Sequence, residues 1–122
     1  MRFSANLGFL WRDLPFLERI ARAAAAGFDA VEFHDDAQAA DPAALGAALA
    51  QAGLPVLCLN TSMREGGLAG VPGREGNARA HIDRAIEVAK AVGAGALTCM
   101  MPAAPLAHST PRLTGWSRLP SI

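Results

Sequence analysis

Apolar and polar positions along this chain follow two different periods. Short, mostly apolar stretches at residues 3–7, 29–33, 55–59 and 96–100 have the length and composition of β-strands. Between them, apolar residues recur every three or four positions, which predicts helices. Strands that alternate with helices in this way are typical of a parallel sheet, because parallel neighbours need a long crossover connection.

Capping residues indicate where the three predicted helices begin and end. Asp13 and Pro15 mark the start of the first helix, and Asp41-Pro42 provides an N-cap and a first helical residue for the second. The third helix is expected to cover about residues 75–92. Each helix is expected to end at a glycine, namely Gly27, Gly53 and Gly93.

The distribution of apolar residues also predicts which surfaces are buried. Residues 55–59 are nearly all apolar, which is typical of a strand covered on both faces. In the third helix the apolar positions form one stripe, made of Ala78, Ile82, Ala85, Ile86 and Ala89. Two α/β architectures accommodate such elements, about half of a TIM-type (β/α)8 barrel and an open, doubly wound sheet. The pattern alone does not choose between them.

The alternating pattern ends near Met101. From there, prolines at positions 102, 105, 111 and 120 interrupt the chain, helical periodicity is lost and no acidic residue occurs. We therefore expect two regions. Residues 1–101 form the partial β/α unit, and residues 102–122 form an irregular tail that is non-native or disordered.

Composition excludes several classes of function. The 122 residues are 52% hydrophobic and 18% charged, which favours one packed domain. The net charge is zero, so we expect neither nucleic acid nor a membrane surface as a partner. Cys58 and Cys99 lie in apolar runs without Cys-x-x-Cys spacing, which predicts buried thiols in a reducing compartment. No apolar run has the length of a membrane span or a signal peptide, and we expect a cytoplasmic protein.

The candidate chemistry lies at the carboxyl ends of the predicted strands, where parallel β/α folds collect their ligand-binding groups. These positions are Asn6, Glu32, His34, Asn60, Thr98 and Cys99. We expect Glu32 or His34 to form a hydrogen bond with a substrate. The amide of Asn60 suits either a substrate hydroxyl or the cap of the loop that follows, and both readings stay open.

A metal centre is one alternative at these positions. The densest group of potential ligands is Glu32, His34, Asp35 and Asp36, whose carboxylates and imidazole suit zinc, manganese or iron. Adjacent residues of a strand point to opposite faces, so the four side chains cannot all converge. We therefore expect no metal site in this chain.

The loop at residues 61–74 is a second place where a ligand could bind. It is glycine-rich and precedes a helix, as phosphate-binding loops do, but it lacks a Gly-Lys-Ser/Thr ending. A mobile loop at the mouth of a barrel fits better, with Arg64 or Arg74 binding a substrate carboxylate. His81, within the third helix, is expected to be partly exposed and structural.

Five stretches of the chain form a familiar combination. They are Phe3-Ser4-Ala5-Asn6-Leu7, Pro15-Phe16-Leu17-Glu18-Arg19, Ala26 to Phe33, Asn60-Thr61 and Gly67 to Glu75. Together they resemble the hydroxypyruvate isomerase family, which includes the 2-oxo-tetronate isomerases and belongs to the xylose-isomerase-like β/α barrels. The resemblance covers roughly residues 3–97, and the stretch from Leu68 to Glu75 is its most specific part.

This resemblance implies a TIM-type barrel and an aldose–ketose isomerisation, such as that of hydroxypyruvate to tartronate semialdehyde. The substrate would be a small hydroxy or oxo acid. The chemistry needs an acid and a base, and full-length members of the family often use a divalent metal. The residues that would meet the substrate are Asn6, Glu32, His34, Asn60, Arg64 and Arg74.

The chain also departs from the family. Members are about twice as long, and their catalytic and metal-binding carboxylates lie on later strands, so we expect no catalytic residue and no bound cofactor here. Around the fourth strand the family usually reads His-Val-Met-Ala-Gly. Here Leu97 is followed by Thr98-Cys99-Met100-Met101-Pro102. We therefore expect a reading frame that is altered or truncated near residue 98.

Three hypotheses about function follow. The first is an isomerase fragment that is inactive alone and associates with itself through open sheet edges. The second is a self-sufficient isomerase built from two copies, with Glu32 and His34 as the groups that move protons. The third is a non-enzymatic α/β module that binds a small molecule or a partner. We favour the first.

Overall fold

Four parallel strands and their connecting helices make up residues 1–103, the part of the chain that the computed structural model describes. The strands are β1 (Ser4–Asn6), β2 (Ala30–Phe33), β3 (Val56–Asn60) and β4 (Ala96–Thr98). The helices are α1 (Phe16–Ala25), α2 (Asp36–Ala39), α3 (Pro42–Ala52), α4 (Glu75–Val92) and the short 3₁₀ helix η1 (Arg64–Gly66). The predicted alternation of strands and helices is confirmed, and α2 and η1 are the additions to it.

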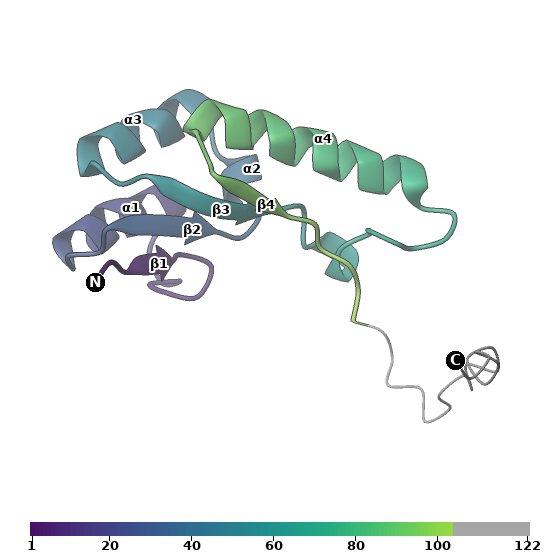
Figure 1. Ribbon diagram of the computed structural model, residues 1–122, viewed down its shortest axis with the longest axis horizontal. Helices are drawn as coiled ribbons and strands as arrows, with labels where there is room; N and C mark the ends of the chain where they lie inside the picture. Colours follow the sequence, from purple (N-terminus) through teal and green to yellow (C-terminus); the bar gives the residue numbers. More distant parts are fainter. Residues whose placement is uncertain (104–122) are drawn as a thin grey trace, which may run out of the picture.

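The order of the strands decides between the two architectures that the sequence left open. The strands lie in the order β1-β2-β3-β4, so each strand pairs with the one that follows it in the chain. A doubly wound sheet instead reverses its order at a switch point and carries helices on both faces. Here α1, α3 and α4 lie on one side of the sheet (Figure 1). The fold is therefore the α/β arrangement of consecutive units of a TIM-type barrel.

Local capping explains where α3 begins and ends and where α1 ends. The carboxylate of Asp41 accepts a hydrogen bond from the N–H of Ala44 at 2.8 Å, and proline occupies the start of α3, as predicted. Gly53 ends this helix with a φ of 65°. After α1, Gly27 has a φ of 83°, a left-handed conformation that glycine adopts without the steric cost of a Cβ. Asp41, Gly53 and Gly27 therefore act as the sequence predicts, whereas Asp13 does not cap α1, which begins after Pro15 without a side-chain cap.

The hydrophobic core lies between the sheet and the layer formed by α1, α3 and α4. Its largest fully buried side chains are Phe33, Leu7, Ile20, Leu45, Leu59 and Val31. Burial of each side chain of this kind contributes about 1.5–3 kcal/mol. This single layer of packing is thus the main source of stability in the described unit.

Three expectations about burial were wrong. The sequence predicts Ile86 in the buried stripe of α4, but 37% of it is exposed, whereas Val88 is buried. It also predicts cover on both faces of β3, yet Leu57 is 46% exposed, because helices cover one face of the sheet in residues 1–103. The two thiols are not buried either: Cys58, on the uncovered face, is half-buried, and Cys99, which follows β4, is exposed.

The predicted tail at residues 102–122 lies outside the described residues from position 104 onward. Its boundary and its non-native origin therefore stay predictions. Within residues 1–103, no helix is both long and apolar enough to cross a membrane.

Candidate functional site

One face of the sheet carries the polar side chains that the sequence singled out. Side chains of a strand alternate between the two faces, so the neighbours of the buried core residues point away from the helices. A register shift between β2 and β3 at Leu57 interrupts this alternation once, and the pairing regains it at Cys58. Asn6 pairs in register with Glu32, and Glu32 pairs with Cys58. Two residues beyond Cys58 on β3, Asn60 pairs with Thr98. Asn6, Glu32 and Asn60 thus come together at the carboxyl ends of three neighbouring strands.

Asn6 shapes the loop that follows β1. Its Oδ1 accepts a hydrogen bond from the N–H of Gly8 at 3.0 Å, and its backbone oxygen accepts from Phe9 and Leu10 at 3.2 and 3.1 Å. The side-chain oxygen is therefore used within the protein. The Nδ2 donor makes no hydrogen bond to another residue of the described chain, so it is the part of Asn6 that suits a ligand.

Glu32 and Asn60 differ in how far their side chains are engaged. Glu32 is half-buried, and its carboxylate has no hydrogen bond or ion pair with residues 1–103. Asn60 directs its Nδ2 to the sulfur of Met63 at 3.8 Å, a weak contact within the loop that follows β3. Its backbone oxygen accepts from the side chain of Gln38 at 2.6 Å. The carboxylate of Glu32 is thus available to accept a hydrogen bond from a ligand, whereas the side chain of Asn60 is partly engaged in holding the loop after β3.

His34 lies where the loops after β1 and β2 meet. Its ring packs edge-on against Phe9, with ring centroids 4.6 Å apart. The same ring occupies the space that a side chain at Gly8 would need. It also lines a hollow of about 400 Å³, called here the His34 hollow. The lining residues are Gly8, Phe9, Arg12, Arg19, His34, Asp35, Asp36 and Met63.

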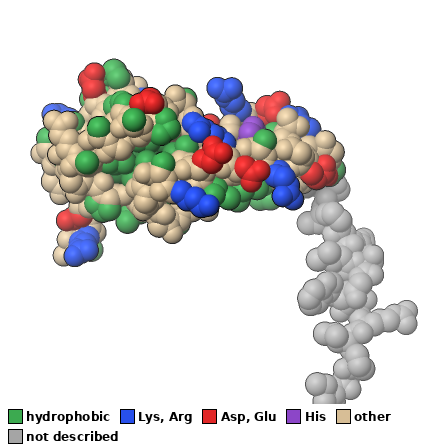
Figure 2. Space-filling view, turned by 90° about the horizontal axis from the view of Figure 1, so that it is seen from above, with side chains coloured by type: hydrophobic (Ala, Val, Ile, Leu, Met, Phe, Trp, Pro, Cys, Tyr) green, Lys and Arg blue, Asp and Glu red, His purple; other side chains and the backbone are tan. Residues whose placement is uncertain are grey.

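The two arginines predicted to bind a carboxylate lie elsewhere. Arg74 donates to the carboxylate of Glu65 at 2.7 Å, and both side chains are largely exposed. Arg64 lines an adjoining hollow of about 390 Å³ between α2 and α4, together with His81 and Arg84, and this hollow shares Asp35 and Asp36 with the His34 hollow. Basic and acidic side chains gather over the half of the helix-covered face that contains this hollow (Figure 2). His81 is half-buried, as predicted, although its Nδ1 has no hydrogen-bond partner among the described residues.

The group Glu32, His34, Asp35 and Asp36 does not fit a metal centre. Asp35 accepts a hydrogen bond from the N–H of Met63 at 2.8 Å, and Asp36 lies 3.7 Å from the guanidinium of Arg19. Each of these two carboxylates is thus already engaged within the protein. No group of three or more His, Cys, Asp or Glu side chains in residues 1–103 could hold a metal ion.

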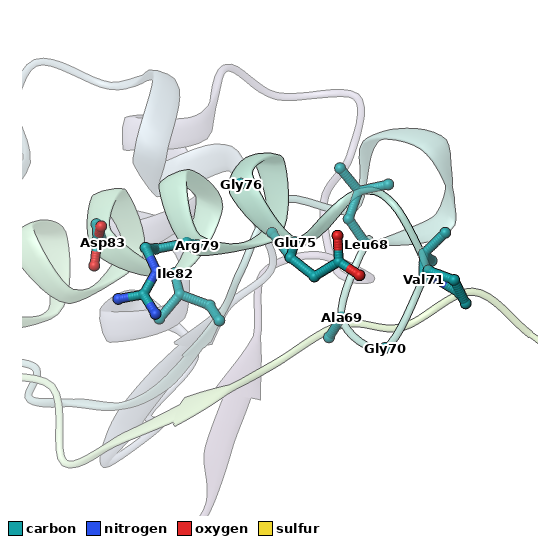
Figure 3. Close-up of a pocket in the computed structure, with 11 residues that line it drawn as sticks. Leu68, Ala69, Gly70, Val71, Glu75, Gly76, Arg79, Ile82 and Asp83 are labelled. Atoms are coloured by element: carbon teal, nitrogen blue, oxygen red, sulfur yellow. The ribbon is translucent and has the colours of Figure 1, made fainter.

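A larger hollow lies beside the glycine-rich loop. It measures about 670 Å³, is lined by Leu68 to Pro72 and the first three turns of α4, and is mainly apolar (Figure 3). Glu75 stands at its edge. The backbone N–H groups of Glu75 itself and of Gly73 hold the pKa of this carboxyl below its ordinary value. The hollow shares no lining residue with either of the other two.

Sequence reasoning missed Arg12, which shares the His34 hollow. Ligand groups were expected at the first residues after each strand, whereas Arg12 lies further along the loop after β1. The whole of that loop belongs to the same end of the sheet. Extending the search across the loop would have included Arg12.

Comparisons with known proteins identify the family. The sequence profile described as "Xylose isomerase-like TIM barrel" matches residues 20–119. The 2-oxo-tetronate isomerase of Cupriavidus necator is 43% identical over 96 residues, a match that covers 75% of this chain and 37% of that protein. The hydroxypyruvate isomerase of Escherichia coli is 33% identical over 118 residues, covering 93% of this chain and 45% of that protein.

A solved structure shows the same fold. The crystal structure of AP endonuclease, family 2, from Brucella melitensis matches with a TM-score of 0.74 and 35% sequence identity. That match covers 81% of this chain and 40% of the other. The chain thus spans about two fifths of the length of the relatives that it matches. Both its sequence and its consecutive parallel strands place it: the chain belongs to the xylose isomerase-like TIM-barrel family.

Proposed function

We propose that this chain forms one wall of the substrate pocket of an isomerase acting on a short hydroxy or oxo acid, of the hydroxypyruvate or 2-oxo-tetronate type. The observation that carries the proposal is the placement of Asn6, Glu32 and Asn60 at the carboxyl ends of three neighbouring strands, on the face without helices. In β/α barrels this face is the interior, and this end holds the active site. The identity of 33–43% to isomerases named for such substrates supports the same conclusion.

The polar groups on this face suit a hydroxy-oxo acid. Isomerisation of such an acid moves a proton between neighbouring carbons, so it needs a base, an acid and donors to the substrate oxygens. Glu32 can accept a hydrogen bond from a substrate hydroxyl. The carboxamide nitrogens of Asn6 and Asn60 can donate to a hydroxyl or carbonyl oxygen.

We further propose that the 122-residue chain binds such an acid without converting it. Glu32 is the one carboxylate that the strands of residues 1–103 place on the uncovered face. Shuttling a proton between two carbons while protonating the carbonyl oxygen uses more than one such group in most enzymes of this kind. We therefore expect this wall to bind the acid but not to catalyse its isomerisation.

Calorimetric titration and a turnover assay test the two parts separately. Titration of the chain with hydroxypyruvate should show saturable binding. Glu32→Gln should weaken that binding about tenfold, because a charge-assisted hydrogen bond is lost. Glu87→Gln is the matched control. Glu87 is exposed on α4, and its ion pair with Arg84 at 3.3 Å contributes little to stability.

Two results would contradict the proposal in different places. If the Glu32→Gln and Glu87→Gln variants bind hydroxypyruvate equally tightly, Glu32 does not face the ligand. Conversion of hydroxypyruvate by the wild-type chain, with or without added manganese or magnesium, would show that this wall is sufficient for turnover.

We also propose that the chain works in the cytoplasm and associates with itself. Cys58 and Cys99 are both free thiols, which supports a reducing compartment. In the described sheet β1 and β4 each have one neighbouring strand, and an open strand edge favours pairing with another chain. Size-exclusion chromatography should therefore show an apparent mass that rises with concentration. A constant monomer mass would contradict the self-association.

A further inference from the structure

The His34 hollow holds a guanidinium whose donors are free. Arg12 and Arg19 both line this hollow. Arg19 donates to two backbone oxygens, at 2.9 and 3.1 Å, and lies 3.7 Å from Asp36. Arg12 is exposed and makes no ion pair or side-chain hydrogen bond within residues 1–103. Of the two, Arg12 is therefore the arginine that can bind a ligand without breaking an existing contact.

The loop that carries Arg12 is held in place on both sides. Before it, the side chain of Asn6 accepts a hydrogen bond from Gly8 at 3.0 Å. Next to it, Trp11 has a φ of 52°, which is unusual for a bulky residue, and its ring packs edge-on against Phe28 at a centroid distance of 6.2 Å. Strained conformations persist where surrounding contacts impose them, and they gather at ligand-binding sites. The backbone thus presents Arg12 from a defined position.

The acidic residues of the hollow do not block an anion there. Asp35 accepts a hydrogen bond from the N–H of Met63, and Asp36 faces the guanidinium of Arg19. Each carboxylate therefore already has a donor or a positive charge beside it. The guanidinium of Arg12 has no such partner among the described residues, so its N–H donors are available to a ligand.

We propose that Arg12, rather than Arg64 or Arg74, binds the carboxylate of the substrate. The planar guanidinium presents two parallel N–H donors that match both oxygens of a carboxylate. Arg74 is paired with Glu65, and Arg64 does not line the His34 hollow but the adjoining one between α2 and α4. The inference rests on the proposed function. It adds the residue that distinguishes an oxo acid from a neutral ketone.

Two ligands that differ in their charge test this role. The 122-residue chain is titrated with hydroxypyruvate and with hydroxyacetone, which has a methyl group in place of the carboxylate. The wild type should bind hydroxypyruvate at least about tenfold more tightly. Arg12→Gln should remove most of this preference, and Arg12→Lys should keep part of it, because lysine retains the charge without the paired donors.

Arg22→Gln is the matched control, because Arg22 is an exposed arginine in the last turn of α1 and its loss changes the net charge equally. Its preference should equal that of the wild type. Circular dichroism of each variant confirms that the fold is kept. An Arg12→Gln chain with the full preference overturns the inference and leaves the proposed function standing. If Arg12→Gln and Arg22→Gln lose the preference for hydroxypyruvate equally, the inference is overturned too. A wild type that binds neither ligand overturns both the inference and the proposed function.

Discussion

Replacing Gly8 by alanine probes the contact that fixes His34. A Cβ at Gly8 would lie 2.5 Å from Cδ2 of His34 and nearer still to two other ring atoms. Carbon atoms in contact are normally about 3.5–4.0 Å apart, so the ring has to move by roughly 1 Å or more. One of the crowded atoms is Cγ, which is bonded to the Cβ of His34. The ring can therefore escape only through rotation of χ1 or a shift of the backbone.

The expected loss of stability follows from three contributions. Overpacking of this kind costs about 1–3 kcal/mol. Rotation of the ring also ends its edge-on contact with Phe9, which contributes about 0.5–1.5 kcal/mol. Alanine also lowers the conformational entropy of the unfolded chain, which stabilises the folded state by about 0.4–1 kcal/mol. Gly8→Ala should therefore lower the free energy of unfolding by about 1–3 kcal/mol.

Urea unfolding followed by circular dichroism measures this change, with Gly46→Ala as the control. Gly46 lies within α3 and has no heavy atom near its missing Cβ, so the same substitution there should stabilise the protein by about 0.5–1 kcal/mol. Adding His34→Ala to Gly8→Ala should recover part of the loss, because the clash is removed. Equal stability of Gly8→Ala and the wild type would refute the close packing of Gly8 and His34.

Three further changes test other parts of the structure. Asp41→Ala should lower the free energy of unfolding by about 0.5–2 kcal/mol through loss of the helix cap, whereas Asp41→Asn should retain most of it; urea unfolding distinguishes them. Gly67→Ala should be more costly than Gly8→Ala, because Gly67 has a φ of 89° and its Cβ would lie 2.5 Å from the backbone of Met100; similar stability to the wild type would contradict this. The pKa of Glu75, followed by NMR, should lie below its ordinary value. Its stabilising effect should then be present above the unfolded pKa and fade as pH falls through the lower folded one, and an unshifted pKa would contradict the contact with Gly73.

Features that depend on neighbours in the chain were predicted well. Asp41 caps α3 and Gly53 ends it, because a cap needs a few adjacent residues. The pattern of strands and helices did not predict the strand order, since pairing joins segments that lie about 25 residues or more apart. The resemblance to β/α barrels did predict it, and the structure confirms it. Val88 was missed because α4 carries two overlapping apolar stripes, and only the packing shows which one is buried.

The candidate site could be predicted only in part for the same reason. The end of each strand locates Asn6, Glu32 and Asn60, since parallel strands share their carboxyl edge. The contact between Gly8 and His34 joins two loops and leaves no mark in the local sequence. The glycine-rich loop drew attention to Arg64 and Arg74; Arg74 is paired with Glu65, Arg64 lines the hollow between α2 and α4, and their role in binding a carboxylate stays a prediction.

The central claim is that the carboxyl ends of β1, β2 and β3 face a small hydroxy or oxo acid. The most direct test is a chemical-shift titration of the isotope-labelled 122-residue chain with hydroxypyruvate. The account predicts saturable shifts that are largest at Asn6, Glu32, His34 and Asn60 and absent from α3. Shifts that do not saturate, or that are confined to the helix-covered face, would contradict it.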